Sequence, residues 1–466
     1  MGQKQKHALK SDPNDETKKK RRVGFSGIDA GVEAKDCIRI FLVSSKEEFD
    51  APESFIINPV DLNSYFDDDG KIYGYEGLKI NIWVSRISFY AYADIAFDSS
   101  ADRGKGITDL KVALQAIFAE TLVDNKDEFL QKYLMDKDFV SKSISTGEIL
   151  KHKAFKHADS DDSNVEVVRL KAGNMATGQL YSHIIPLVLL LVDGSSPIDV
   201  TDSMWELYVV VQKKTDQQGE IQCLLLGFTA IYRFYHYPDN SRLRLGQILV
   251  LPPYQHKGYG RYLLEVLNDV AIAENVFDLT VEEPLDNFQH VRSCVDTQRL
   301  LGFEPIQHLV TKAVSLLKDG KLSKRTHSPR LTPPPSAVED VRKHLKITKT
   351  QFLKCWEVLI YIGLNPIDKY LENFVSVISE RVKYDILGKD SGTAGKQLIE
   401  VPCNVNEEMS FVMFKSGAGE DIAVQMDDNQ TSQEEQLRKL VQDRVKEIQL
   451  IAEKVTSPLG SSEVAN

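Results

Sequence analysis

The chain has 466 residues, of which 42% are hydrophobic and 27% charged, and this is ordinary for a soluble protein of two to four domains. Its five cysteines show no CxxC spacing, which argues against a disulfide framework and against a zinc site, so we expect no metal. The most apolar run, 184–192, contains Pro186 and is too short for a membrane helix, which needs about 20 residues. It is typical of a buried strand or short core helix, and no membrane association is expected.

The net charge of −11 is unevenly distributed along the chain. Residues 1–22 carry eight Lys or Arg and three acids, a net of +5, which leaves −16 for the rest. An acidic body attracts basic partners and repels nucleic acid, so we expect no direct nucleic-acid binding. A surface that is acidic only for solubility would give the same composition.

The N-terminal residues 1–35 are polar and basic and are predicted to be a disordered tail. The basic run 18–22 is typical of a nuclear import signal, although a solvated charge run would look alike. No apolar stretch follows the first lysines, which argues against a secretory signal.

Two mixed regions follow the tail, and together they indicate an α+β fold. Residues 36–160 are predicted to form an N-terminal mixed α/β domain, with strands at 37–43 and 78–84 and a helix at 110–122. Residues 161–318 are predicted to form a second, strand-rich domain. Its predicted strands are 205–212, 224–237, 242–251 and 276–281, and its predicted helices are one starting at Gly258 and one over 288–301.

The last third of the chain is predicted to be a C-terminal helical region, 339–466, reached through a Pro-rich linker at 319–338. Helical spacing is evident at 352–359 and 370–387. A final helix is predicted to open with a capping box from Ser432 to Glu435. Between these helices, residues 388–431 form a Gly- and Asp-rich insertion with one strand-like piece at 410–414.

The segment 247–264 reads as a strand, a turn and a helix, and it contains Gln255-x-x-Gly258-x-Gly260. Glycines let the backbone adopt positive φ and approach a ligand closely, and the N–H groups of a helix start attract anions. A pyrophosphate would fit such a turn. The spacing is too short for a P-loop, and the third glycine of a dinucleotide-binding Rossmann turn is absent.

This turn resembles the cofactor turn of the Gcn5-related N-acetyltransferase fold. Together with 232–239 and 278–284, in that order, it resembles more closely the catalytic subunits of type B histone acetyltransferases. Residues 68–79 resemble that family's N-terminal domain, and the likeness covers about 37–310. It implies an enzyme that transfers acetyl from acetyl-CoA to the N-terminal tail of newly made histone four. It also implies a WD-repeat histone-binding chaperone as partner.

The resemblance implies where acetyl-CoA binds. The strand before the turn would pair its backbone with the pantetheine arm, and the turn would hold the pyrophosphate, while Asn287 maps near a family residue that touches CoA. The implied cofactor-binding residues are Leu249, Val250, Leu251, Gln255, His256, Lys257, Gly258, Tyr259, Gly260, Arg261, Tyr262 and Asn287.

The resemblance also implies catalytic carboxylates. Only a neutral lysine amine attacks a thioester, and a nearby carboxylate can accept its proton. The family's general base maps to Glu282. Its neighbour is Glu283, where the family usually has aspartate, and a proposed accessory base maps to Asp193. Adjacent residues of a strand point to opposite faces, which favours one of the pair, Glu282, unless the strand has ended.

Two stretches are implied to contact the histone tail. Arg233, Phe234 and Tyr235 lie in the aromatic strand, where one face is expected to be core. Asp68, Asp69 and Gly70 form the second contact, since carboxylates suit a tail rich in Lys and Arg. A solvated turn is the alternative for this Asp run.

The sequence therefore predicts a histone lysine acetyltransferase that works by direct attack, without a cysteine acyl-enzyme. Two alternatives are an acetyltransferase of the same fold with another amine acceptor and a noncatalytic histone-binding chaperone. The resemblance implies an enzyme that meets histones before they are deposited on DNA, which indicates the cytoplasm. The basic tail indicates the nucleus, so we expect both locations.

Overall fold

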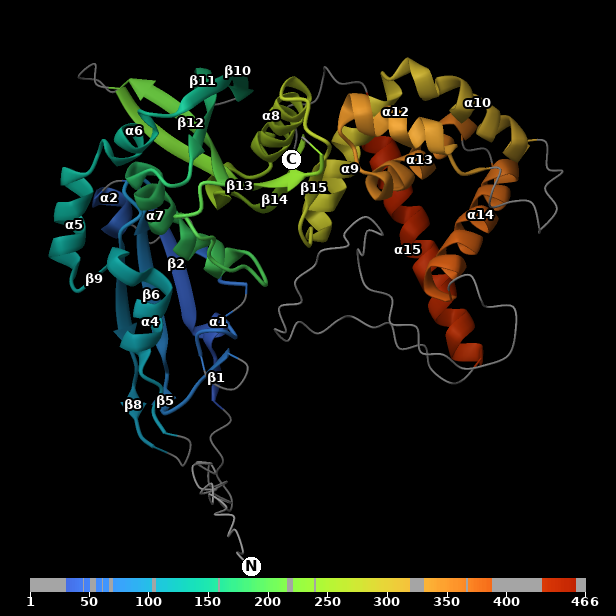
Figure 1. Ribbon diagram of the computed structural model, residues 1–466. Helices are drawn as coiled ribbons and strands as arrows, with labels where there is room; N and C mark the ends of the chain where they lie inside the picture. Colours follow the sequence, from blue (N-terminus) through green and yellow to red (C-terminus); the bar gives the residue numbers. More distant parts are fainter. Residues whose placement is uncertain are drawn as a thin grey trace, which may run out of the picture. The chain divides into compact units, whose positions relative to one another are not determined.

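The computed structural model describes residues 31–44, 46–50, 56–60, 62–66, 70–102, 106–157, 160–215, 221–238, 240–318, 331–365, 368–387 and 430–457 (Figure 1). They form two compact units. The N-terminal unit comprises the described residues of 1–85, 90–130 and 189–194, and the second unit comprises those of 86–89, 131–188 and 195–466. None of the described helices is both long and apolar enough to cross a membrane.

The N-terminal unit is built on a five-stranded sheet in the order β3-β2-β6-β7-β9. The predicted strands 37–43 and 78–84 are confirmed as β2 and β6, which pair in parallel. The predicted helix 110–122 ends earlier, because Ala119 takes a left-handed φ of 46°. The elements are β1 (Val32–Glu33), α1 (Ala34–Cys37), β2 (Ile38–Val43), α2 (Lys46–Asp50), β3 (Ile56–Ile57), β4 (Lys71–Ile72), β5 (Tyr75–Glu76), β6 (Lys79–Ser85), β7 (Ala91–Ala96), β8 (Ser99–Ser100), α4 (Leu110–Phe118), the 3-10 helix η1 (Ala119–Thr121) and β9 (Leu122–Val123).

The second unit contains a six-stranded sheet in the order β10-β11-β12-β13-β14-β15 (Figure 1). Neighbouring strands are antiparallel except β14 and β15, which pair in parallel over three residues. The register between β13 and β14 shifts at Ala230/Ile231, so that Gly246 is the extra residue of a bulge. The strands are β10 (Glu148–His157), β11 (Ser160–Lys171), β12 (Trp205–Thr215), β13 (Ile221–His236), β14 (Asn240–Val250) and β15 (Leu279–Val281).

Helix α8 (Tyr259–Ala273) connects β14 to β15 and packs against one face of this sheet. Its predicted apolar face is confirmed, because Leu263, Leu267, Val270 and Ala271 are all buried. The opposite face carries α7 (Met175–Leu191), whose Tyr181 ring lies 6.4 Å from Phe228 of β13. The apolar run 184–192 is thus mostly helix. The remaining elements before the sheet are α5 (Lys126–Met135) and α6 (Phe139–Ile144).

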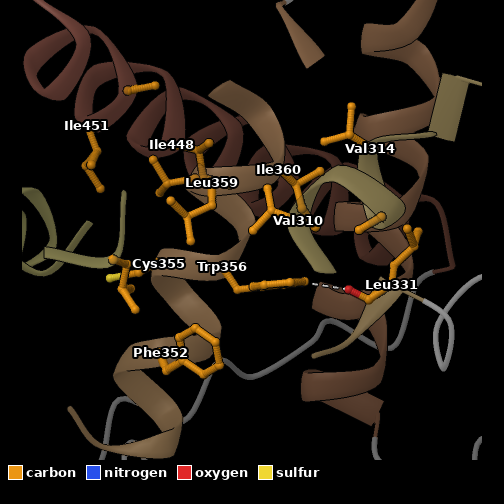
Figure 2. Close-up of a cluster of buried hydrophobic side chains, with 14 of the residues drawn as sticks. Val310, Val314, Leu331, Phe352, Cys355, Trp356, Leu359, Ile360, Ile448 and Ile451 are labelled. Carbon is orange, nitrogen blue, oxygen red and sulfur yellow. Dashed lines mark hydrogen bonds between the residues drawn. The ribbon is translucent and has the colours of Figure 1, made fainter. Parts of the chain in front are cut away.

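The C-terminal helical region has its own core, centred on α13 (Figure 2). Trp356 is buried and its Nε1–H donates to the carbonyl oxygen of Leu331 over 2.8 Å. The helical spacing predicted at 352–359 and 370–387 is confirmed. The helices are α9 (Asp286–Leu301), α10 (Glu304–Lys318), α12 (Pro335–Leu345), α13 (Lys349–Leu364), α14 (Asp368–Leu387) and α15 (Gln430–Thr456).

This region also extends the sheet of the second unit. The N–H of Leu279 in β15 donates to the carbonyl oxygen of Lys346 over 2.9 Å. Leu279 and Ile347 form a parallel bridge. The chain that joins α12 to α13 therefore lies beside β15 and extends the edge of the sheet by one short bridged segment.

Several boundaries differ from the sequence prediction. Strand β10 pairs with β11, so the sheet of the second unit begins before the predicted boundary at 160/161. The described structure begins at 31, within the predicted tail. Pro335 starts α12 inside the predicted linker, and α15 begins two residues before Ser432, which is therefore no N-cap. Residues 319–330 and 388–429, including the strand-like 410–414, lie outside the described residues.

Candidate active site

The turn after β14 has the backbone geometry that its glycines predict. Gly258 takes a φ of 85° and is the N-cap of α8, and no side chain caps this helix start. The N–H groups of the first helical turn therefore have no intrahelical acceptor. A Cβ added at Gly260 would lie 3.7 Å from Val250, so the helix packs closely on the strand end. The arrangement is suited to a diphosphate.

The strand before the turn has one edge without a strand partner. β14 runs to Val250, but its pairing with β15 ends at Leu245 and Val281. On that edge, 246–250 face no other strand among the described residues. The backbone groups there can pair with an extended ligand, as the strand prediction for Leu249 to Leu251 requires.

The other predicted cofactor residues divide into two groups. Gln255, His256 and Lys257 are exposed, and the Gln255 Nε2 donates to the carbonyl oxygen of Val250 over 2.9 Å. Tyr259 and Tyr262 are instead buried in the core, and burial raises the pKa of the Tyr262 phenol to about 12. Their side chains serve packing, so only their backbone can reach a ligand.

Two further predicted contacts have side chains engaged within the protein. The Arg261 guanidinium binds Glu265 over 2.7 Å and Gln298 over 2.6 Å. The Asn287 Oδ1 accepts from the N–H of Phe288 over 2.7 Å. Leu249 and Leu251 have buried side chains. The backbone of Leu251 is engaged within the protein, because its N–H donates to the carbonyl oxygen of Leu226 over 2.9 Å and its carbonyl oxygen accepts from the N–H of Tyr254 over 2.8 Å.

Glu282 and Glu283 follow directly after β15 and are both exposed. The N–H of Glu282 donates to the carbonyl oxygen of Leu245 over 2.9 Å, so its backbone continues the sheet by one residue. Glu283 has a left-handed φ of 37°, which turns the chain away. The strand has thus ended, and alternation between faces no longer decides which of the two points toward a substrate.

An aromatic surface leads to Glu282 on the sheet face opposite α8. Ile231, Leu243 and Leu245 pack under α8, so the alternating Tyr232, Phe234 and Arg244 point to the other side. The rings of Trp205 and Tyr232 are 5.0 Å apart and those of Tyr232 and Phe234 4.5 Å apart. We call this the acceptor face, formed by Trp205, Tyr232, Phe234, Arg244 and Glu282.

Gly246 lies between Trp205 and Glu282 on this face. A Cβ there would come within 3.0 Å of the Trp205 ring and 3.7 Å of the Glu282 Oε2. Sequence reasoning did not select Trp205, Arg244 or Gly246. The available signal was pairing, because Trp205 lies opposite Tyr232, and Tyr232 opposite Arg244.

Arg233 does not lie on the same face of the sheet as Phe234, although the resemblance implied both as contacts of the histone tail. Its guanidinium binds Glu206 over 3.1 Å and Glu274 over 2.7 Å on the α8 side, where Arg169 also binds Glu206. Burial would raise the pKa of Glu206, but hydrogen bonds from Arg169 and Tyr208 outweigh it and the pKa is lowered. Tyr235 is exposed, and its hydroxyl donates to the carbonyl oxygen of Pro238.

The N-terminal unit holds the remaining predicted residues. Gly70 and Asp193 line a polar depression, while Asp68 and Asp69 lie outside the described residues. Within the described part of the chain, no three His, Cys, Asp or Glu side chains are grouped to hold a metal ion. The other residues lining the depression are Glu33, Lys35, Val60, Leu62 and Asn63.

Comparison with known proteins shows which family this chain belongs to. Residues 30–193 match the family described as "Histone acetyl transferase HAT1 N-terminus", and 196–291 match the "Acetyltransferase (GNAT) family". A histone acetyltransferase type B catalytic subunit of Arabidopsis thaliana is 54% identical, over 97% of this chain and 98% of the relative. The chain belongs to the type B histone acetyltransferase catalytic subunits. The predicted α+β class, with a central Gcn5-related acetyltransferase fold and a C-terminal helical region, is confirmed.

More distant members of the family are also similar. The type B catalytic subunit of Zea mays is 46% identical over 95% of this chain and 94% of the relative. One from Dictyostelium discoideum is 25% identical over 73% and 70%. This type B subunit is therefore an acetyl-CoA-dependent acyltransferase, and its uncapped glycine turn and the open edge of β14 fit that co-substrate.

Proposed function

We propose that the chain acetylates lysines in the N-terminal tail of newly made, non-nucleosomal histone four, with Glu282 as general base. The observation that carries this proposal is the position of Glu282. Its exposed carboxylate lies at the end of β15, beside the last residue of β14 that pairs with β15. This position supports the assignment of Glu282 as a proton acceptor next to the open edge of β14.

Acetyl-CoA supplies an activated acetyl thioester when it is bound. In this proposal the open edge of β14 at Leu249 and Val250 aligns the thioester, and the turn from Gln255 to Tyr262 holds the diphosphate. Backbone N–H donors that meet the acetyl oxygen would stabilise negative charge as it develops there. Lys257 is exposed beside the turn and adds positive charge.

The acceptor lysine must lose a proton before it attacks. Its ordinary pKa near 10.4 makes the neutral amine cost about 4.6 kcal/mol at pH 7. Glu282 accepts that proton directly or through a water molecule. Trp205 and Tyr232 line the way to it with flat apolar surface, which suits the methylene stem of a lysine.

Several carboxylates suit a basic tail. Outside residues 1–22 the chain carries a net charge of −16. Asp193 and Glu33 line the depression in the N-terminal unit, and Asp68 and Asp69 are close to Gly70 in sequence. We propose this depression as a tail contact, with Asp193 able to accept a proton as an accessory base.

Two further proposals concern the partner subunit and the cellular location of the protein. The relatives are named as catalytic subunits, and this supports a partner subunit, for which we propose a WD-repeat histone-binding chaperone. The basic run 18–22 supports a nuclear pool beside a cytoplasmic one.

Mass spectrometry of the products tests the proposal. The chain is incubated with acetyl-CoA and a histone four tail peptide, a matched peptide with every lysine replaced by arginine, or a polyamine. We expect acetyl groups on tail lysines only. Acetylation of the polyamine alone would assign another acceptor, and tight tail binding without acetylation in any arm would identify a chaperone.

A further inference from the structure

Arg244 lies beside the proposed base on the acceptor face. Its Nε atom is 3.3 Å from the Glu282 Oε2. Its guanidinium carbon lies 4.5 Å from the centre of the Phe234 ring, a cation–π distance. The Arg244 side chain is 28% exposed and that of Glu282 45%, so the cation lies deeper than the carboxylate.

The backbone of Arg244 is held from both sides. It lies opposite Tyr232 of β13 and opposite Thr280 of β15, in the stretch Leu243 to Leu245 where β14 has strand partners on both edges. Glu282 follows Thr280 by two residues, and because its N–H still bonds the carbonyl oxygen of Leu245, its side chain lies on the same face as that of Arg244. The sheet register itself brings the two charges together.

The contact is an ion pair rather than a hydrogen bond. The Arg244 Nε is buried and has no hydrogen-bond partner among the described residues, although the Glu282 oxygen is near. An arginine that gripped the carboxylate with two aligned hydrogen bonds would occupy the oxygens that must accept a proton. The pair seen here restrains the carboxylate and leaves its oxygens free for an amine.

We propose that Arg244, supported by Phe234, is a positioning residue that orients the Glu282 carboxylate toward the acceptor lysine. This inference rests on the proposed function, in which Glu282 is the base. Arg244 touches no reacting atom in this account. Its contribution is to limit the directions that an exposed glutamate side chain would otherwise sample.

Substitution of Arg244 separates positioning from substrate or cofactor binding. Arg244→Gln should lower kcat by about 10- to 100-fold, the effect of a misplaced catalytic group. The KM for acetyl-CoA should stay near the wild-type value, since the glycine turn is untouched. Arg244→Lys should recover part of kcat, because it keeps the charge but lacks the planar group that stacks on Phe234.

A double-mutant cycle with Glu282→Gln tests whether Arg244 acts through the base. If it does, Arg244→Gln lowers kcat in the wild-type background and changes it little when Glu282 is already Gln. Equal fold-losses in both backgrounds would overturn the proposal while leaving the base in place. A wild-type rate in Glu282→Gln would remove the base, and with it the role of Arg244.

Folding is the control for this cycle. Thermal melting of each variant shows whether lost activity reflects lost structure. If Arg244→Gln melts well below the wild type, Arg244→Lys replaces it in the cycle, and an equal fold-loss of kcat from Arg244→Lys in both backgrounds would overturn the proposal. Arg438→Gln on the exposed side of α15 controls for removing one arginine charge, and its kcat should be unchanged.

Discussion

The N–H of Glu282 donates to the carbonyl oxygen of Leu245 over 2.9 Å, one residue after β15 has ended. The backbone is therefore fixed by the sheet while the side chain is exposed. Glu282→Gln should leave the fold intact and lower turnover at neutral pH by ~10²–10⁴-fold, the range for loss of a general base. Steady-state kinetics with a histone tail peptide measures this.

Two variants serve as comparisons for Glu282. Glu283→Gln should lose less, because Glu283 has left the sheet with a φ of 37°. Glu304→Gln, an exposed acid at the start of α10, should keep wild-type turnover. A larger loss in Glu283→Gln than in Glu282→Gln would exchange the roles of the two carboxylates.

Gly258 should be required for binding acetyl-CoA. Its φ of 85° costs a residue with a side chain about 1–2 kcal/mol, and a β-branched one more. Gly258→Val should therefore weaken CoA affinity by about tenfold or more, as measured by titration calorimetry. Gly302→Ala is the matched control, because Gly302 has an ordinary φ of −84° and CoA should bind this variant normally.

The buried ion network around Glu206 should make the free energy of unfolding depend on pH in the acidic range. Removing one partner of such a network costs about 3–5 kcal/mol, so Glu206→Gln should be clearly less stable than the wild type at pH 7. The folded-state pKa of Glu206 is lowered. Its stabilising effect is thus present above the unfolded value, near 4.3, and is lost as the pH falls through the lower folded value.

Denaturant unfolding at pH 7 and at successively lower pH checks this expectation. The difference in unfolding free energy between wild type and Glu206→Gln should shrink below about pH 4. A difference that stays constant down to pH 3 would show that the charge of Glu206 is not what stabilises the network.

Trp356 should stabilise the C-terminal helical region through packing and through one hydrogen bond. Trp356→Ala should cost about 3–5 kcal/mol of stability. Trp356→Phe keeps most of the ring but removes one of the two donors to the Leu331 carbonyl oxygen, since Arg381 still donates to it over 3.1 Å, and this should cost about 0.5–1.5 kcal/mol. Equal losses in both variants, measured by chemical denaturation, would assign the stability to the hydrogen bond alone.

The sequence predicted best those helices and strands in which one regular spacing of apolar residues dominates. Apolar spacing located α8, α13 and the long strands, and the glycines located the turn, since these signals are local. The sequence analysis did not predict β10 or β11, and their pairing was therefore missed as well. The sequence analysis also placed the end of the helix that begins at Leu110 too late, because no glycine marks the positive φ at Ala119.

The candidate site was predicted only in part for a related reason. Residues contiguous in sequence, such as 255–260 and 282–283, could be selected from one motif. Arg244 and Trp205 reach Glu282 only through strand register, which one sequence does not provide. Arg233 was selected with Phe234 as a neighbour, but adjacent strand residues face opposite ways, and Arg233 joins the ion network under α8.

The bridge between Leu279 and Ile347 bears on how this enzyme can be divided. The acetyltransferase match stops at residue 291, in the middle of α9, whereas the bridged segment beside β15 comes from 56 residues further along the chain. A fragment cut at the match would expose the outer edge of β15 at Leu279, three residues before Glu282, to water or to another strand. The acetyltransferase domain and the C-terminal helical region of this protein therefore belong together as one structural unit.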